Sequence, residues 1–298
     1  MTSAAVQSDS TRRAGDPIAV ANAPSSFVAL MYHNVAPDGE TYPDLSPSAT
    51  SYFVSRTQFD SQIARVARCG ASRMRLGDVR QFYAVDHRAD LRRAASGILL
   101  TFDDGWADGV DVGGPILERY GCGAFLFVTT EFLGKPRFLT RAALRKLDPN
   151  VFRIGSHART HRMLSHLGES EIRAELSESK KFLEDAVGYS VDTLSIPSGA
   201  VDARVRRIAA ECGYSCVFDS EVRVNRRGDS PMAISRVAVM RDTRPAAFDR
   251  YLQQRVTRER VRRAALQAPK RVLGLRRYER LRRWLLGERR GQRVTHQS

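Results

Sequence analysis

The chain has 298 residues, of which 42% are hydrophobic and 27% are charged, as in a soluble globular protein. This length suits one large α/β domain or two small ones, and it is enough to bury a sizeable core. No run of about twenty apolar residues occurs, so we expect no transmembrane helix. The net charge of +15 is uneven, because residues 255–298 hold fifteen Arg or Lys against three Glu and therefore +12 of that total. The basicity belongs to a C-terminal extension.

The N-terminal segment, residues 1–25, is rich in Ala, Ser, Asp and Thr, and we expect it to be disordered. Arg12 and Arg13 are not followed by the stretch of roughly 7–15 apolar residues that a secretory signal needs. The cysteines are scattered, and we predict that they are small core residues, which is typical of a reducing compartment; they are Cys69, Cys122, Cys212 and Cys216. These features together predict a cytoplasmic protein.

From about residue 26 to residue 251, apolar runs alternate with amphipathic stretches. In chain order, the predicted strands are 27–32, 73–76, 97–102, 124–128, 152–155, 193–196, 216–218 and 234–239. The predicted helices are 58–68, 108–120, 141–147, 170–187 and 203–212. This alternation indicates a mainly parallel sheet covered by helices. Because seven or eight such units favour a barrel over an open sheet, the predicted fold is α/β, a distorted (β/α) barrel of seven or eight parallel strands over residues 26–254.

The C-terminal segment, residues 255–298, places apolar residues among arginines. Pro269 and Gly274 are predicted to break it into two basic helices. The segment could be a solvated extension, or it could contact an anionic membrane surface through residues such as Trp284 and Leu285. Nucleic-acid binding is the least favoured interpretation, because arginine runs serve phosphate generally and no nucleic-acid motif accompanies them.

Two adjacent carboxylates follow a predicted strand. The apolar run that ends at Phe102 leads to Asp103 and Asp104, and then to the turn residue Gly105. Side chains of neighbouring residues on an extended segment point to opposite sides, so the two acids are expected to have different tasks. One could bind a metal while the other handles protons. Asp-Asp-Gly by itself is more typical of a simple turn.

Two histidines, His157 and His161, follow the predicted strand 152–155. Their spacing of four would place both imidazoles on the same side of a helical turn. An isolated pair of this kind is more often exposed than bound to a metal. One carboxylate and two imidazoles, however, form the three-ligand set of a catalytic divalent metal, which leaves a position for water. These residues follow strands, where the active site of a barrel lies.

The motifs resemble those of the polysaccharide deacetylases, carbohydrate esterases that share the chitooligosaccharide deacetylase homology domain. Residues 101–105 (Thr-Phe-Asp-Asp-Gly) resemble the first motif, and residues 156–161 (Ser-His-Ala-Arg-Thr-His), with Leu164, resemble the second. Residues 195–199 stand where the Arg/Ala-x-Pro-Tyr/Phe-Gly motif would be. Residues 31–35 and 234–237 are similar to the branch that acts on poly-N-acetylglucosamine-like glycans. The resemblance covers about residues 26–245.

The resemblance implies a distorted β/α barrel, a divalent metal that is usually zinc, and removal of acetyl from an N-acetylated sugar. It implies that Asp103 is the general base and that the metal ligands are Asp104, His157 and His161. It also implies substrate contacts from the motif residues Pro197, Ser198 and Gly199.

The chain departs from the family pattern in two places. Ser198 replaces the aromatic residue that usually lines the acetyl pocket. The late Leu-x-x-His motif, whose histidine is the usual general acid, is absent, because the only late histidine is His296 in the tail.

Three further residues are candidates for the site. His33, at the exit of the first predicted strand, could protonate the leaving amine; alternatively it only hydrogen-bonds the substrate, or Asp103 returns the proton. Arg236 could pair with Asp103 and keep it ionised, or form an ordinary surface ion pair. Trp106 could stack on a sugar ring or serve only in packing.

The residues and the resemblance predict an intracellular, metal-dependent deacetylase of an N-acetylated sugar. The sugar could belong to a polysaccharide, an oligosaccharide, or a lipid- or nucleotide-linked intermediate at the cytoplasmic membrane. The alternative is a glycan-binding or scaffold protein that has lost turnover, which Ser198 and the missing late histidine motivate. The intact Asp-Asp and His-His sets favour the enzyme, since a pure binder has no need to keep base and ligands together.

Overall fold

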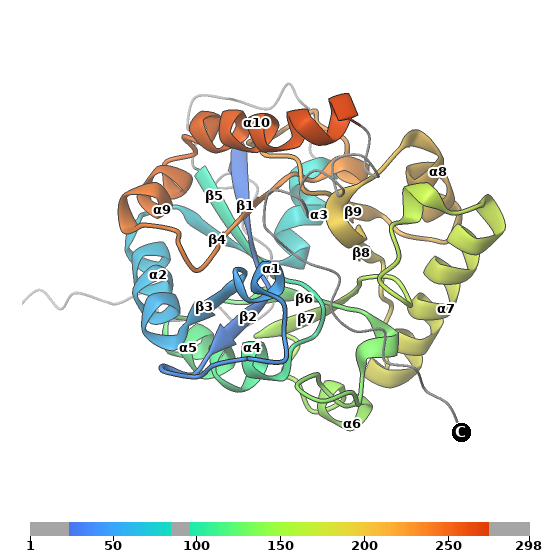
Figure 1. Ribbon diagram of the computed structural model, residues 1–298, viewed down its shortest axis with the longest axis horizontal. Coiled ribbons are helices and arrows are strands. Elements are labelled where there is room, and N and C mark those ends of the chain that lie inside the picture. The colour runs from blue at the N-terminus through green and yellow to red at the C-terminus, as the bar shows by residue number, and fades with distance from the viewer. Residues whose placement is uncertain (1–23, 85–95, 274–298) are drawn as a thin grey trace, which may run out of the picture. The chain divides into compact units, whose positions relative to one another are not determined.

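The computed structural model describes residues 24–84 and 96–273, with side chains through residue 265 (Figure 1). The described residues divide into two units, of which the first ends at Val256 and the second begins at Thr257. In the second unit the described part is the helix α10 (Thr257–Leu273), which continues through Pro269, where a break was predicted. The predicted disordered N-terminal segment lies almost wholly outside the described residues, as does the predicted second helix of the tail.

A curled sheet of parallel strands forms the centre of the first unit (Figure 1). Its neighbouring strands are, in order, β1 (Ser26–Tyr32), β5 (Ser96–Phe102), β6 (Ala124–Val128), β7 (Phe152–Ser156), β8 (Thr193–Ser195) and β9 (Cys216–Phe218). The strand β11 (Arg236–Ala238) pairs in parallel with β1. A bridge between Phe218 and Ile234 links β9 to the segment that leads into β11. This arrangement confirms the predicted α/β fold of the distorted barrel type.

Smaller strands extend this arrangement. The first half of β5 pairs with β4 (Ser72–Met74), and its second half pairs with β6. The short β10 (Asn225–Arg226) runs antiparallel to β1, and β2 (Asn34–Ala36) forms a separate parallel pair with β3 (Phe53–Ser55). Each of the eight predicted strands has a counterpart in the structure, whereas β2, β3 and β10 were not predicted.

The strands are apolar on both faces because both faces are covered. In β5, Leu100 and Phe102 belong to the cluster that faces the surrounding helices, whereas Leu99 belongs to a cluster enclosed by the strands. Phe125 and Phe127 of β6 lie in the same enclosed cluster. Along each strand, every second side chain therefore faces the same cluster, which is the alternation expected for a strand. A continuous apolar run such as residues 97–102 is therefore the signature of a doubly buried strand.

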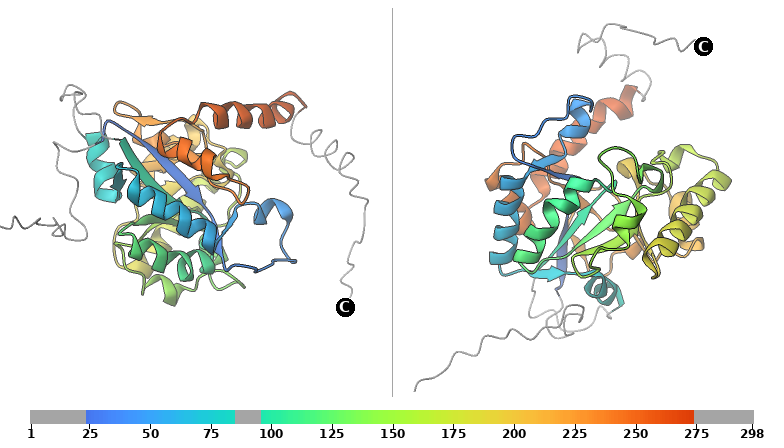
Figure 2. Two further views of the ribbon diagram at one scale, coloured as in Figure 1. Left: turned by 90° about the vertical axis from the view of Figure 1, so that its left-hand side faces the viewer. Right: turned by 90° about the horizontal axis from the view of Figure 1, so that it is seen from below.

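Helices lie around the outside of the sheet (Figures 1 and 2). They are α2 (Arg56–Arg68), α4 (Ala107–Asp111), α5 (Gly113–Arg119), α7 (Glu169–Val187), α8 (Ala203–Glu211) and α9 (Pro245–Leu252), with the short α1 (Pro47–Thr50) and α6 (Arg141–Leu144). The helix α3 (Leu76–Ala84) differs, because its Val79 and Phe82 contribute to the cluster enclosed by the strands.

Several details differ from the predictions. The helix predicted over 108–120 is divided into α4 and α5 at Val112, next to a Gly-Gly-Pro sequence of poor helix formers. The helix α9 was not predicted.

All four cysteines are free; Cys122 and Cys216 are buried, but Cys69 is exposed at the end of α2 and is not a core residue. Among the described residues, no helix is both long and apolar enough to cross a membrane.

Candidate active site

A left-handed turn after β5 gives the two adjacent carboxylates different hydrogen-bond partners. The amide of Asp103 still donates to the carbonyl oxygen of Tyr32 (3.0 Å) and so extends the contact with β1. Asp104 then has a φ of 75° and Gly105 a φ of 92°. A Cβ atom at Gly105 would also lie 3.3 Å from Val128 Cγ1, so glycine suits this position. The two carboxylates have different partners, Arg236 for Asp103 and Trp106 for Asp104. Both nevertheless lie near Nε2 of His157, at 3.9 Å and 3.5 Å, so the left-handed turn does not place them on opposite sides as an extended strand would.

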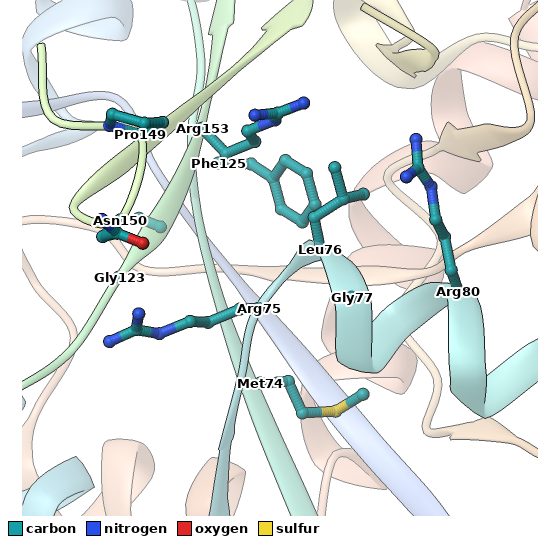
Figure 3. Close-up of a pocket in the computed structure, with 11 residues that line it drawn as sticks. Met74, Arg75, Leu76, Gly77, Arg80, Gly123, Phe125, Pro149, Asn150 and Arg153 are labelled. Atoms are coloured by element: carbon teal, nitrogen blue, oxygen red, sulfur yellow. The ribbon is translucent and has the colours of Figure 1, made fainter. Parts of the chain in front are cut away.

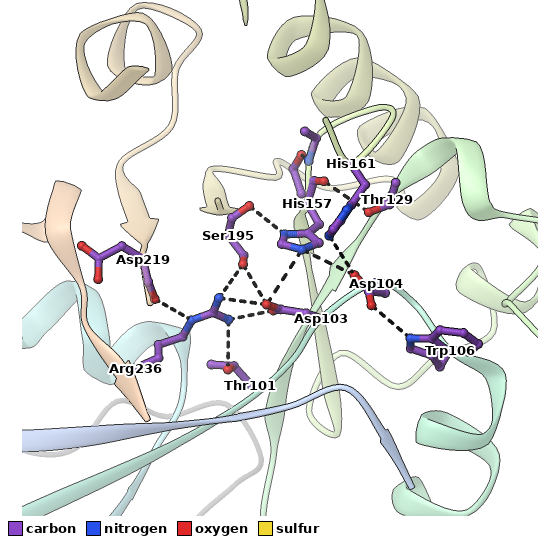
Figure 4. A network of polar contacts seen from close by, with 12 residues as sticks. Thr101, Asp103, Asp104, Trp106, Thr129, His157, His161, Ser195, Asp219 and Arg236 are labelled. Atoms are coloured by element: carbon purple, nitrogen blue, oxygen red, sulfur yellow. Dashed lines mark hydrogen bonds and ion pairs between the residues drawn. The ribbon is translucent and has the colours of Figure 1, made fainter. Parts of the chain in front are cut away.

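Asp103 forms a buried ion pair with Arg236, as the sequence suggested (Figure 4). The guanidinium donates to Oδ1 at 2.7 Å and to Oδ2 at 2.8 Å, and the Ser195 hydroxyl donates to Oδ2 at 3.2 Å. Burial would raise the pKa of Asp103, but Arg236, helped by His157 and His33, holds that pKa well below its usual range. Asp103 is therefore ionised at neutral pH. Arg236 is fixed by further bonds to the carbonyl oxygen of Asp219 and to the hydroxyls of Thr101 and Ser195.

Asp104, His157 and His161 converge on one point (Figure 4). Oδ1 of Asp104 lies 3.5 Å from Nε2 of His157 and 3.4 Å from Nε2 of His161. Tetrahedral ligands at about 2.1 Å from a zinc ion are about 3.4 Å apart, so the spacing fits such an ion. Oδ1 of Asp104 is also buried and has no hydrogen-bond partner. A buried carboxylate oxygen needs a partner, and a divalent cation would supply one.

The ring of His157 has the tautomer and the charge state that metal binding would require. Its Nδ1 lies 2.8 Å from the carbonyl oxygen of Ser195, which can only accept, so Nδ1 carries the proton and Nε2 presents its lone pair toward Asp104. Burial lowers the pKa of His157 to about 4, although Asp103 and Asp104 oppose this effect. The imidazole is therefore neutral at pH 7, which is the form that binds metals.

The two histidines do not lie on a helical turn. His157 directly follows β7, and residues 157–163 form an irregular loop. Ala158 and His161 have φ angles of 60° and 64°, and this left-handed backbone bends the chain so that the two rings lie 4.9 Å apart. The predicted convergence is present, but the helical explanation for the spacing of four was wrong.

Trp106 is buried among aromatic side chains and does not line an open surface. Trp106 is only 6% exposed. The centroid of its ring lies 4.9 Å from that of Phe53 and 4.2 Å from that of Phe138. The indole Nε1 donates to Oδ2 of Asp104 at 3.1 Å. Trp106 therefore offers no free face to a sugar ring and instead orients a metal-ligand candidate.

The predicted substrate motif follows β8. Pro197 is buried, whereas Ser198 is exposed with a φ of 60°. Gly199 also has a positive φ, and a Cβ atom there would overlap the side chain of Ser220, so this position requires glycine. Of the three residues, Ser198 has the side chain that solvent or a ligand can reach.

His33 lies between β1 and β2, with its ring 4.4 Å from that of Tyr52. Its Nδ1 is buried and has no hydrogen-bond partner. When charged, His33 helps to lower the pKa of Asp103, so it lies within electrostatic range of that carboxylate.

A cavity of about 290 Å³ opens elsewhere in the first unit, where β5 exchanges its partner β4 for β6 (Figure 3). Three arginines line it, Arg75, Arg80 and Arg153, and no carboxylate or histidine does. This cavity lacks metal ligands and contains none of the predicted site residues. The Asp-His-His cluster, and not this cavity, is the candidate active site.

Two residues of the site were not predicted. The hydroxyl of Ser195 donates to Asp103 and its carbonyl oxygen accepts from His157, so Ser195 links these two residues. Glu175 of α7 bonds the loop that carries His161. Ser195 stands in a motif that the sequence showed, but nothing in the sequence singles out Glu175 among the acidic residues of α7.

Comparison with known proteins shows which family and which folds the chain resembles. Residues 91–217 match the sequence model of the family described as polysaccharide deacetylase. The Bacillus subtilis protein YxkH, whose name assigns it provisionally to the polysaccharide deacetylases, is 23% identical over 230 residues that span 77% of each chain.

Among solved structures, the Streptococcus pyogenes deacetylase PplD in complex with acetate is similar with a TM-score of 0.65 at 20% identity, over 77% of this chain and 99% of that one. IcaB from Ammonifex degensii is similar with a TM-score of 0.65 at 20% identity, over 78% of this chain and 97% of that one. At these identities the structures establish the fold. The family model matches residues 91–217, which carry Asp103, Asp104, His157 and His161, and so identifies a polysaccharide deacetylase domain in this part of the chain; the family consists of hydrolases of carbon–nitrogen bonds other than peptide bonds.

Proposed function

We propose that the protein is a metal-dependent deacetylase that removes the acetyl group from an N-acetylated sugar. The observation that carries this proposal is the unpartnered Oδ1 of Asp104 between Nε2 of His157 and Nε2 of His161, beside the ionised Asp103. The family match supports an acetylated sugar as the substrate class. Zinc is the proposed ion, because one carboxylate and two imidazoles are ligands that it accepts.

A divalent ion held by Asp104, His157 and His161 would polarise the acetyl carbonyl and lower the pKa of a water molecule to about 7. The protein then has to supply a base for the proton that water loses on attacking the carbonyl carbon. Asp103 is ionised and lies 3.9 Å from His157 Nε2, so its carboxylate is beside the ligands without being needed as one. We assign it as the base, with Arg236 as the residue that keeps it ionised and in place.

Cleavage of the carbon–nitrogen bond requires a proton for the departing amine. His33 has a buried Nδ1 without a partner and lies within electrostatic range of Asp103, so we assign it as the donor. If Asp103 returned the proton instead, His33→Gln would keep most of the acetate release; if His33 is the donor, that variant loses it while binding zinc normally.

The exposed Ser198 favours a substrate that is more than a small free sugar. A serine at this position does not enclose the acetyl group as an aromatic ring would, and its side chain is open to solvent. We therefore propose that binding free energy comes from contacts beyond the acetylated residue, as in a polymer or a carrier-linked sugar. Pro197 and Gly199 shape the turn that presents Ser198.

A peripheral contact of the basic tail with anionic lipid, at the cytoplasmic face of the membrane, belongs to the same proposal. Residues 255–298 carry +12 of the net charge, and Val261 of α10 is an exposed apolar residue among arginines. Each basic residue near an anionic surface contributes about 1 kcal/mol, and salt weakens this attraction. Co-sedimentation with anionic liposomes should be lost when residues 257–298 are removed, and equal sedimentation of both forms would contradict the contact.

Acetate release from a panel of N-acetylated sugars tests the proposed activity. The panel includes free oligosaccharides, polymers, and lipid- and nucleotide-linked sugars, each with and without zinc. His161→Ala should abolish release, whereas His166→Ala is the matched control, because His166 is exposed and follows His161 by five residues. Zinc binding without acetate release from any substrate would favour the alternative, a glycan-binding protein that has lost turnover.

A further inference from the structure

We propose that Glu175 is a positioning residue for the metal site, because its carboxylate holds the loop of His161 in the conformation that metal binding requires. The inference rests on the proposed function, since it concerns how the third ligand is kept in place. Glu175 lies in α7, fourteen positions after His161 in the chain, and it is not itself one of the converging ligands.

The carboxylate of Glu175 is fully engaged with the loop. Its Oε2 accepts hydrogen bonds from the amides of Arg159 (3.0 Å) and Thr160 (2.9 Å). Its Oε1 accepts a third bond, from the hydroxyl of Thr160 at 2.6 Å. Glu175 is only 2% exposed, so water cannot easily replace these bonds. All three donors belong to the two residues that precede His161.

The loop needs such support because its backbone is unfavourable. Ala158 and His161 both have left-handed φ angles, which residues other than glycine rarely adopt. Such conformations persist only where the surrounding structure enforces them. On the other side of the loop, the carbonyl oxygens of Ala158 and Arg159 accept bonds from the amides of Thr130 and Glu131. Among the described residues, Thr160, the neighbour of His161, donates its amide and hydroxyl hydrogen bonds to Glu175 alone.

The role differs from a general contribution to stability. The helix α7 is anchored by the buried side chains of Ile172, Leu176 and Leu183, which do not depend on Glu175. Loss of the carboxylate would therefore leave the helix packed but free the amides of Arg159 and Thr160. A shift of Thr160 moves His161 directly, because the two residues share a peptide bond.

The test compares zinc affinity among three variants of the full chain, by competition with a chromogenic chelator. Glu175→Leu should weaken zinc binding about tenfold to a hundredfold, as is typical when a residue that orients a ligand is lost. Glu175→Gln should stay within about threefold of wild type, because the amide oxygen can accept both backbone bonds while the NH₂ group donates to the Thr160 hydroxyl. Glu178→Leu is the matched control, since Glu178 is exposed, lies on the same helix and accepts a hydrogen bond from the Arg159 side chain.

The visible absorption spectrum of the cobalt-substituted protein gives a second readout, which should change in Glu175→Leu and not in the other two variants. If Glu175→Leu does not fold, Thr160→Val, which removes one of the three bonds, should weaken zinc binding by a smaller factor of about three to ten. Unchanged zinc affinity and cobalt spectrum in Glu175→Leu would overturn the inference, and so would a glutamine variant as weak as the leucine variant. Failure of the wild-type protein to bind zinc would overturn the proposed metal site itself.

Discussion

The indole Nε1 of Trp106 donates a hydrogen bond to Oδ2 of Asp104, and Oδ1 of the same carboxylate faces His157 and His161. One oxygen is thus occupied by the protein, and the other is left for a cation. The partner that orients a ligand also sets how well the ligand binds, so the indole N–H would contribute to the proposed metal site without touching the ion.

Replacing this indole should weaken the metal site. Trp106→Phe keeps an aromatic ring between Phe53 and Phe138 but removes the N–H, so we expect zinc affinity to fall about tenfold to a hundredfold. Phe138→Leu is the control, because it disturbs the same packing and leaves the hydrogen bond in place. Both affinities can be measured by chelator competition. Equal affinities in the two variants would mean that packing, and not the hydrogen bond, positions Asp104.

The buried pair of Asp103 and Arg236 should make loss of the base costly to stability as well as to catalysis. Asp103→Asn should abolish acetate release and retain one zinc per chain, because Asp103 is not a ligand. It also leaves the guanidinium of Arg236 buried without its counter-charge, which costs about 3–5 kcal/mol. We expect urea unfolding to show this loss.

The double variant Asp103→Asn, Arg236→Met separates the two effects. Removing the unpaired charge should restore most of the stability, while acetate release stays absent because no base is present. A folded Asp103→Asn protein that contains no zinc would show that the roles of Asp103 and Asp104 were assigned wrongly.

The buried neutral His157 should make the metal-free protein sensitive to acid. Burial lowers the pKa of His157 to about 4, whereas an unfolded histidine titrates near 6.5. Between these values the unfolded chain takes up a proton that the folded chain does not, so the free energy of unfolding falls as the pH falls. The expected loss between pH 7 and pH 5 is roughly 2 kcal/mol. Urea unfolding of chelator-treated protein measures it, and His157→Gln should remove this part of the slope; an equally steep slope in the variant would refute the assignment.

The strands and the convergence of Asp104, His157 and His161 could be predicted because their signals are local. A doubly buried strand such as β5 is a continuous apolar run, and the acids and histidines that follow such runs fall at one end of the sheet. The pairing of Arg236 with Asp103, 133 residues apart, was predictable only as a hypothesis, from charge and from the resemblance of its motif.

Other features could not be read from the sequence because they depend on backbone geometry and long-range contacts. The spacing of His157 and His161 suggested a helical turn, yet left-handed residues in a loop bring the rings together. The sequence left open whether Trp106 stacks on a sugar ring or serves in packing, because its burial and its bond to Asp104 follow from the packing of a loop. The bonds of Glu175 to the histidine loop depend on how α7 lies against β7.

Zinc titration of the stripped protein tests the central claim most directly, namely that acetate release depends on one ion bound by Asp104, His157 and His161. Protein freed of metal by a chelator is titrated with zinc while acetate release is measured from a substrate that the sugar panel has identified. We predict no release without zinc, a rise to a plateau at one zinc per chain, and no plateau for His161→Ala. Undiminished acetate release from the stripped protein would contradict the account.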